Sequence, residues 1–89
     1  MKYRSRFAIT SDILCVARDG NATKTRLMYG SSLSFAQINE YLTFLMNNGL
    51  IARGQKTPIY TLTEKGMRFL NIYAELSALI PFDERIPAV

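Results

Sequence analysis

Three side chains with hydrogen-bonding groups lie close together in the middle of the chain: Gln37, Asn39 and Thr43. These are residue types that read base edges, and Asn and Gln can pair with adenine through one donor and one acceptor. The solvent-exposed side of an ordinary helix would have the same composition, so both interpretations, base contact and simple exposure to solvent, stay open. Glu40 lies among them and would repel a phosphate. It therefore either accepts a hydrogen bond from cytosine or lies off the DNA groove, and the second is favoured slightly.

Basic residues are concentrated in the first two thirds of the chain. Residues 1–62 hold eight Lys and Arg against three Asp and Glu, giving +5, whereas residues 63–89 hold three against four, giving −1. This asymmetry suggests a polyanionic partner, although a solvated basic surface would look the same. The candidate phosphate contacts are Lys2, Arg4, Arg6, Lys24, Arg26, Arg53, Gln55 and Lys56. Ser32 and Ser34 are predicted to be structural first, with groups that could also face a phosphate.

The residues needed for several other kinds of function are missing. The sequence has no histidine and a single cysteine, Cys15, which argues against a metal site and an internal disulfide. It has no Gly-rich phosphate loop and no nucleophile paired with a base, so we expect neither a cofactor nor an enzyme. No apolar run reaches the roughly 18 residues of a membrane span, and the N-terminus lacks the apolar middle of a signal peptide. We expect a cytoplasmic, nucleoid-associated protein.

Helical periodicity covers the first half of the sequence. Apolar residues predict a helix over 5–19, and a second helix should start at Thr23 or Thr25 and stop at Gly30. The third helix, at about 35–48, begins after the pattern S-x-x-Q at Ser34, a capping box, with Leu33 turned inward before it. The segment GSSL is therefore a short turn between two helices. Three aromatic residues, Tyr29, Tyr41 and Phe69, are predicted to lie in the core.

The second half reads as a hairpin followed by one more helix. The segments LIAR and IYTL alternate as strands do, around a polar and basic tip at 53–58, with Pro58 at the start of the second strand. Thr63 can cap a helix that Pro81 ends, and 81–89 would be a tail. Apolar residues cover an arc of roughly 220° of this helix, about twice that of an ordinary surface helix, so one part needs a further partner. The predicted dimer contacts are Phe69, Ile72, Tyr73, Leu76, Leu79 and Ile80. Phe44 is predicted to cover this helix or to join a subunit contact.

The order of these elements is that of a winged helix-turn-helix domain, in which the helix after the turn enters the major groove and the hairpin, or wing, contacts the flanking DNA. The runs KTRLMYGSSLSFAQINEYLTFLMNNGLI and YTLTEKGMRFL resemble the small archaeal winged-helix DNA-binding proteins. The resemblance covers about residues 5–75. It implies a sequence-reading or architectural DNA-binding protein that forms a homodimer through its C-terminal helix.

We therefore predict a mainly α fold with a β-hairpin wing (α+β), a winged helix-turn-helix with an extra C-terminal dimerisation helix. Residues 1–62 would form the DNA-binding domain, 63–80 the dimerisation helix and 81–89 the tail. The predicted function is dimeric binding of double-stranded DNA, by a transcriptional regulator or a chromosome-organising protein, with the helix at about 35–48 in the major groove and the 53–58 wing on the backbone. The alternative is a winged-helix protein-interaction module that does not bind DNA, which the absence of cations on the third helix favours.

Overall fold

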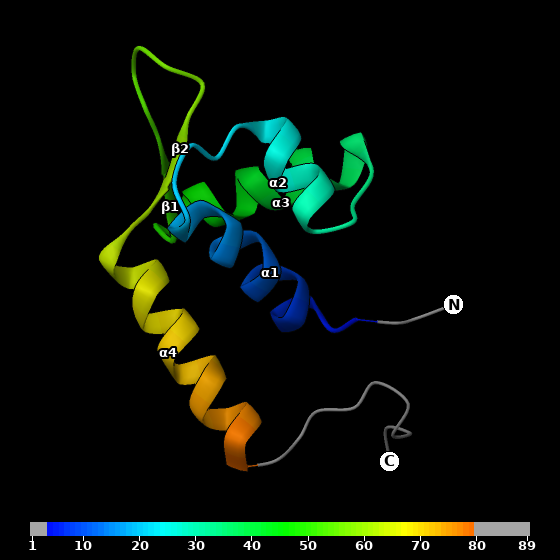
Figure 1. The fold of residues 1–89 in the computed structure, drawn as a ribbon, viewed down its shortest axis with the longest axis vertical. Coiled ribbons are helices and arrows are strands. Elements are labelled where there is room, and N and C mark those ends of the chain that lie inside the picture. Colours follow the sequence, from blue (N-terminus) through cyan, green and yellow to red (C-terminus); the bar gives the residue numbers. More distant parts are fainter. Residues whose placement is uncertain (1–3, 80–89) are drawn as a thin grey trace.

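The computed structural model describes residues 4–79 (Figure 1). In chain order the elements are α1 (Arg6–Arg18), α2 (Lys24–Gly30), α3 (Phe35–Asn47), β1 (Ile51–Arg53), β2 (Tyr60–Leu62) and α4 (Glu64–Leu79). Figure 1 shows α1, α2 and α3 grouped around the base of the hairpin, while the second half of α4 extends away from them. The four helices and the two-stranded antiparallel hairpin confirm the predicted fold class.

Hydroxyl side chains set where the helices begin. The four N-cap residues are Ser5, Thr23, Ser34 and Thr63. Each hydroxyl oxygen accepts a hydrogen bond from a backbone N–H in the first turn, which would otherwise lack a partner. At α3 the cap is reciprocal: Ser34 Oγ accepts from Gln37 N–H at 3.2 Å, and Gln37 Oε1 accepts from Ser34 N–H at 2.9 Å. The predicted capping box is confirmed, and with it the start of α3.

One apolar core joins the three N-terminal helices. Its fully enclosed side chains are Ile13, Leu14, Leu27, Ile38, Leu42 and Leu45. Burying an aliphatic side chain of this size contributes about 1.5–3 kcal/mol, so the inward faces of α1 and α3 supply much of the stability. Leu33 is buried beside them, as predicted, and Leu70 brings the first half of α4 into the same core.

The hairpin is shorter than the sequence pattern suggested. Its register pairs Ile51 with Leu62 and Arg53 with Tyr60, and the segment 54–59 forms the tip. Pro58 lies in this tip and not at the start of the second strand, so that prediction was wrong by two residues. Tyr60 N–H also donates to Ala22 O at 2.8 Å, which attaches the segment between α1 and α2 to the sheet.

The turn between α2 and α3 differs from the prediction in one respect. Gly30 was expected to stop α2 through its backbone freedom, but it is the last residue of the helix, and the positive φ of 56° falls on Ser32. Gly30 is needed for space instead. A Cβ at this position would lie 2.6 Å from Val16 Cγ2, so only a glycine lets α1 and α2 approach this closely.

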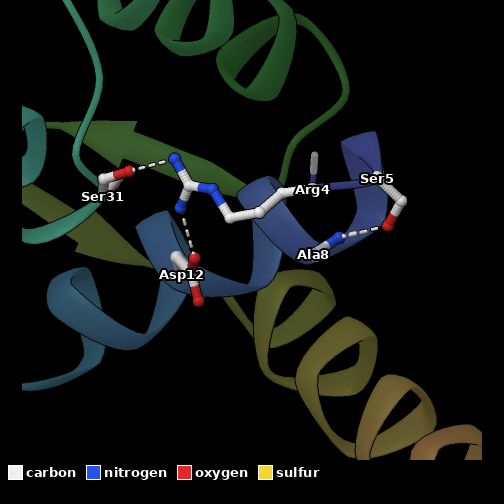
Figure 2. Close-up of polar contacts among 5 residues, drawn as sticks. All are labelled: Arg4, Ser5, Ala8, Asp12 and Ser31. Carbon is white, nitrogen blue, oxygen red and sulfur yellow. Dashed lines mark hydrogen bonds and ion pairs between the residues drawn. The ribbon is translucent and has the colours of Figure 1, made fainter. Parts of the chain in front are cut away.

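Arg4 fastens this turn to the first helix (Figure 2). Its guanidinium donates from Nη1 to Asp12 Oδ2 at 2.6 Å and from Nη2 to Ser31 O at 2.5 Å. One side chain therefore links α1 with the end of α2, 27 positions further along the chain. Charge-assisted bonds of this kind are the stronger class of hydrogen bond, although partial exposure of both side chains reduces their contribution.

We predict that Gly66→Ala destabilises the fold. Helix propensity alone would favour alanine by about 1 kcal/mol. However, a Cβ at Gly66 would press against the backbone carbonyl oxygen of Leu50 and lie 2.5 Å from Leu62 Cδ1, so α4 would have to move away from the hairpin. Overpacking of this kind typically costs about 1–3 kcal/mol, and sterics should win. The measurement is chemical denaturation followed by circular dichroism. Asn71→Ala, an exposed site in the same helix, is the control and should not destabilise; equal or greater stability of Gly66→Ala would contradict the packing.

We also predict that Arg4 and Asp12 are energetically coupled. Arg4→Ala and Asp12→Ala should each lower stability, and the double variant should lose less than the sum. The coupling should be on the order of 0.5 kcal/mol, because the pair is partly solvated. Arg4→Lys should recover only part of the loss, since an ammonium cannot span both acceptors as the guanidinium fork does. Strict additivity in a double-mutant cycle, measured by urea denaturation, would show that the pair does not act as a unit.

Candidate nucleic-acid interface

Packing in the core determines which side of α3 is exposed to solvent. Burial of Ile38, Leu42 and Leu45 leaves the opposite side of the helix in solvent. At 3.6 residues per turn, Phe35, Asn39, Thr43 and Met46 follow the flank of α3 that borders this buried face, spaced i, i+4, i+8 and i+11; Asn39 is half-buried and the other three are exposed. We call these four residues the reading edge. The side chains of Asn39 and Thr43 form no hydrogen bond with any residue between 4 and 79, so their polar groups remain available.

Gln37 lies on the other edge of α3 and is partly committed. Its side-chain carbonyl already accepts from Ser34 N–H, while the Ser34 hydroxyl accepts from Gln37 N–H. Pairing with adenine uses both the donor and the acceptor of an amide, so Gln37 would have to share an oxygen that the cap occupies. Of the two side-chain amides predicted to contact bases, that of Asn39 is therefore the more available.

Cations flank α3 instead of lying on it. In the wing, Arg53, Gln55 and Lys56 are exposed, and neither cation forms an ion pair within the described part of the chain. On α2, Arg26 is exposed, and Lys24 Nζ lies 5.4 Å from the centre of the Phe35 ring. The structure thus places Lys24 directly beside the first residue of α3.

Two of the three predicted N-terminal contacts, Arg4 and Arg6, are described by the structure, and both lie apart from the wing. The guanidinium of Arg4 is held by Asp12 and Ser31, as described above. Arg6 is exposed at the start of α1, and Figure 1 shows this end of α1 and the tip of the hairpin far apart on the folded domain. Ser32, in the turn, is exposed. Lys2 lies outside the described residues.

A groove of about 890 Å³ runs between α1, α3 and α4. Its aromatic lining consists of Phe7, Tyr41, Phe44 and Phe69. Phe44 was predicted to cover the C-terminal helix or to join a subunit contact, and it shares this groove with Phe69 of α4. Glu40 also lines it, together with Lys65 of α4, so the acidic residue of α3 is turned toward α4 and away from the reading edge.

The apolar arc of α4 divides into two parts. Phe69 is half-buried, with its ring centre 6.1 Å from that of Phe7 and 6.2 Å from that of Tyr73. Ile72, Leu76 and Leu79 are exposed at i, i+4 and i+7, with exposed fractions of 51%, 46% and 78%. These three face solvent in the single chain. Ile80, the last predicted dimer contact, lies outside the described residues.

Two exposed aromatic residues were not anticipated. Tyr29 was predicted to lie in the core, but 75% of it is exposed. The prediction was wrong because Tyr29 comes two positions after the buried Leu27, and positions two apart point to nearly opposite sides of a helix. Phe35 is 64% exposed and was not singled out. Its register would have predicted burial, because Phe35 precedes Ile38 by three positions and Leu42 by seven; its exposure follows from its place at the first residue of α3.

Other kinds of site find little support in the described residues. Between residues 4 and 79, no three His, Cys, Asp or Glu side chains gather where they could hold a metal ion. Within the same range, each helix is too short or too polar to cross a bilayer.

Comparison with known proteins places this geometry in a family. The profile of the winged helix-turn-helix family matches residues 3–80. Two uncharacterized proteins of Methanocaldococcus jannaschii are similar: one is 33% identical over 73 residues, covering 82% of this chain and 73% of that protein. The other is 30% identical over 77 residues, covering 86% of this chain but 36% of that protein. The crystal structure of Sso10a-2, a DNA-binding protein from Sulfolobus solfataricus, superposes with a TM-score of 0.65 at 26% identity, covering 90% of this chain and all of that one. The chain therefore belongs to the winged helix-turn-helix family, and its fold is like that of an archaeal DNA-binding protein.

Proposed function

We propose that this protein binds double-stranded DNA, with α3 in the major groove and the wing on the backbone. The observation that carries the proposal is the separation of neutral and basic groups. The reading edge has no charge, whereas the exposed cations Arg26, Arg53 and Lys56 lie on α2 and in the wing. Duplex DNA has the complementary layout, because base edges line the floor of the groove and phosphates line its two walls. A neutral reading edge, with cations supplied by the neighbouring α2 and wing, therefore matches the groove without lysines on α3.

The proposal gives each residue a role. Asn39 and Thr43 contact base edges, with Gln37 as a weaker reader because of its cap. Phosphate contacts come from Lys24, Arg26, Arg53, Gln55 and Lys56, with Arg6 and the turn residues Ser32 and Ser34 as further candidates. We assign Arg4 mainly to holding the turn that orients α3. The similarity to Sso10a-2 supports DNA as the partner.

We further propose that the protein forms a homodimer through α4. Ile72, Leu76 and Leu79 form an exposed apolar stripe on a helix whose second half extends away from the domain (Figure 1). In water such a stripe favours burial against a second apolar face, and Phe69 and Tyr73 extend it toward α1. Two-fold pairing of this helix would present two copies of α3 to one duplex.

A protein-interaction module is the second candidate. It is favoured by the absence of cations on α3 and by its exposed aromatic residues, Phe35 and Phe44. The two candidates differ in their response to salt. Binding that neutralises phosphates weakens steeply as salt rises, whereas an apolar protein contact does not.

Substitutions should separate backbone contacts from base contacts. If five of the proposed cations engage, the logarithm of the binding constant should fall against that of salt with a slope of about −4 to −5 per protomer. Lys56→Ala should weaken binding to every duplex alike and reduce the slope by about one, while Asn39→Ala should cost about 1–3 kcal/mol on a preferred sequence and little elsewhere. Fluorescence anisotropy across a salt series measures both effects.

Lys65→Ala is the matched control for charge, because Lys65 lies in the groove beside α4 and should leave the slope unchanged. If correctly folded protein bound no duplex at low salt, DNA binding would be excluded and a protein partner favoured. Equal losses on every sequence for Lys56→Ala and Asn39→Ala would indicate contact with the backbone alone, as expected of a chromosome-organising protein. Selective loss with Asn39→Ala would favour a regulator.

The dimer proposal makes a separate prediction. Leu76→Asp places a charge in the middle of the apolar stripe, where burial would remove its hydration, so the dimer should dissociate. Sedimentation equilibrium should then give the mass of one chain. Asn71→Asp adds the same charge to α4 outside the stripe and should leave the dimer intact. A wild-type monomer, or a dimer that survives Leu76→Asp, would remove α4 as the interface.

A further inference from the structure

We propose that Phe35 reads thymine, by packing its ring against the C5-methyl group in the major groove. The inference deepens the proposed DNA binding and rests on it. Phe35 is the first residue of α3 and 64% exposed. A ring this exposed leaves apolar surface available to a partner, and covering that surface would be favourable.

The position of Phe35 determines which part of DNA it would meet. In helix-turn-helix proteins the N-terminal residues of the second helix contact the base edges. Phe35 also begins the reading edge, one turn before Asn39 and two before Thr43, so the ring points to the same side as the polar groups proposed to contact bases. A ring there enters the groove together with Asn39.

The charge beside Phe35 favours a nucleic acid over an apolar protein surface. Lys24 Nζ lies 5.4 Å from the ring centre, so any occupant that covers Phe35 comes close to an ammonium group. An apolar protein patch would bury that charge without compensation, which is unfavourable. In the major groove, a phosphate of the groove wall can pair with Lys24 while the ring meets the floor.

The chemistry of the groove floor selects thymine. A phenylalanine ring makes no conventional hydrogen bond, and the C5-methyl of thymine is the apolar group that the major groove presents. Opposite cytosine, the same ring would cover an amino group and leave its donor without water or a partner. Phe35 therefore contributes a preference for A·T pairs beside the position that Asn39 contacts.

The test removes the C5-methyl group of thymine and leaves base pairing unchanged. Binding is measured by fluorescence anisotropy on an alternating A·T duplex of 24 base pairs and on the same duplex with every thymine replaced by uracil. Wild type should bind the thymine duplex about fourfold more tightly for each methyl group buried. Phe35→Ala should bind both duplexes equally, and Phe35→Leu should keep most of the preference.

Phe44→Ala is the matched control, because Phe44 is exposed on the same helix but lies on its other edge, in the groove beside α4. It should keep the wild-type ratio between the two duplexes, and circular dichroism should show all variants folded. Equal wild-type binding to both duplexes, or a ratio that persists in Phe35→Ala, would overturn the assignment of Phe35 while leaving DNA binding in place. Binding to neither duplex would overturn DNA binding itself, and this inference with it.

Discussion

The direction of α3 is set by the four residues between Ser31 and Ser34. Each end of this turn is fixed by a different contact: Arg4 holds Ser31 O to α1, and the capping box closes the Ser34 end. Between them Leu33 is buried and Ser32 has a positive φ of 56°, a conformation that side chains other than glycine adopt at a cost. Because both ends are held and Leu33 is buried, the turn has little freedom to change the direction of α3.

A fixed direction for α3 explains how one helix serves both the core and the surface. Ile38, Leu42 and Leu45 are enclosed, while Phe35, Thr43 and Met46 on the flank beside them are exposed. The helix itself carries Glu40 and no cation, while Arg53 and Lys56 are supplied by the hairpin. In the proposed complex, attraction to phosphate and contact with bases would therefore come from different elements. This division allows the helix to remain apolar enough to pack while the domain keeps its positive charge.

The hairpin and α4 are coupled by close packing at Gly66. The backbone of Leu50 lies where a Cβ would be, so the start of α4 follows the base of the hairpin directly. From there α4 passes α1, places the ring of Phe69 beside that of Phe7 at a tilt of 55°, and exposes Ile72, Leu76 and Leu79. The proposed DNA-binding and dimer surfaces are therefore connected through the packing of α4 against the hairpin and α1.

Contacts within a few positions along the chain were determined by the sequence alone. The N-caps, the capping box and the apolar spacing of α3 involve neighbours within one or two helical turns. The caps at Ser34 and Thr63 appear where predicted, and Thr23 is one of the two residues expected to cap α2, whereas the cap at Ser5 was not predicted. The order of these elements was enough to identify the winged helix fold.

Only the tertiary structure decided the roles of residues whose partners lie far away in sequence. Gly30 is small because Val16 packs on it, Arg4 is held by Ser31, and Tyr29 is exposed because α2 buries Leu27. Periodicity shows that a residue lies on a face, but which segment covers that face depends on how distant parts of the chain meet.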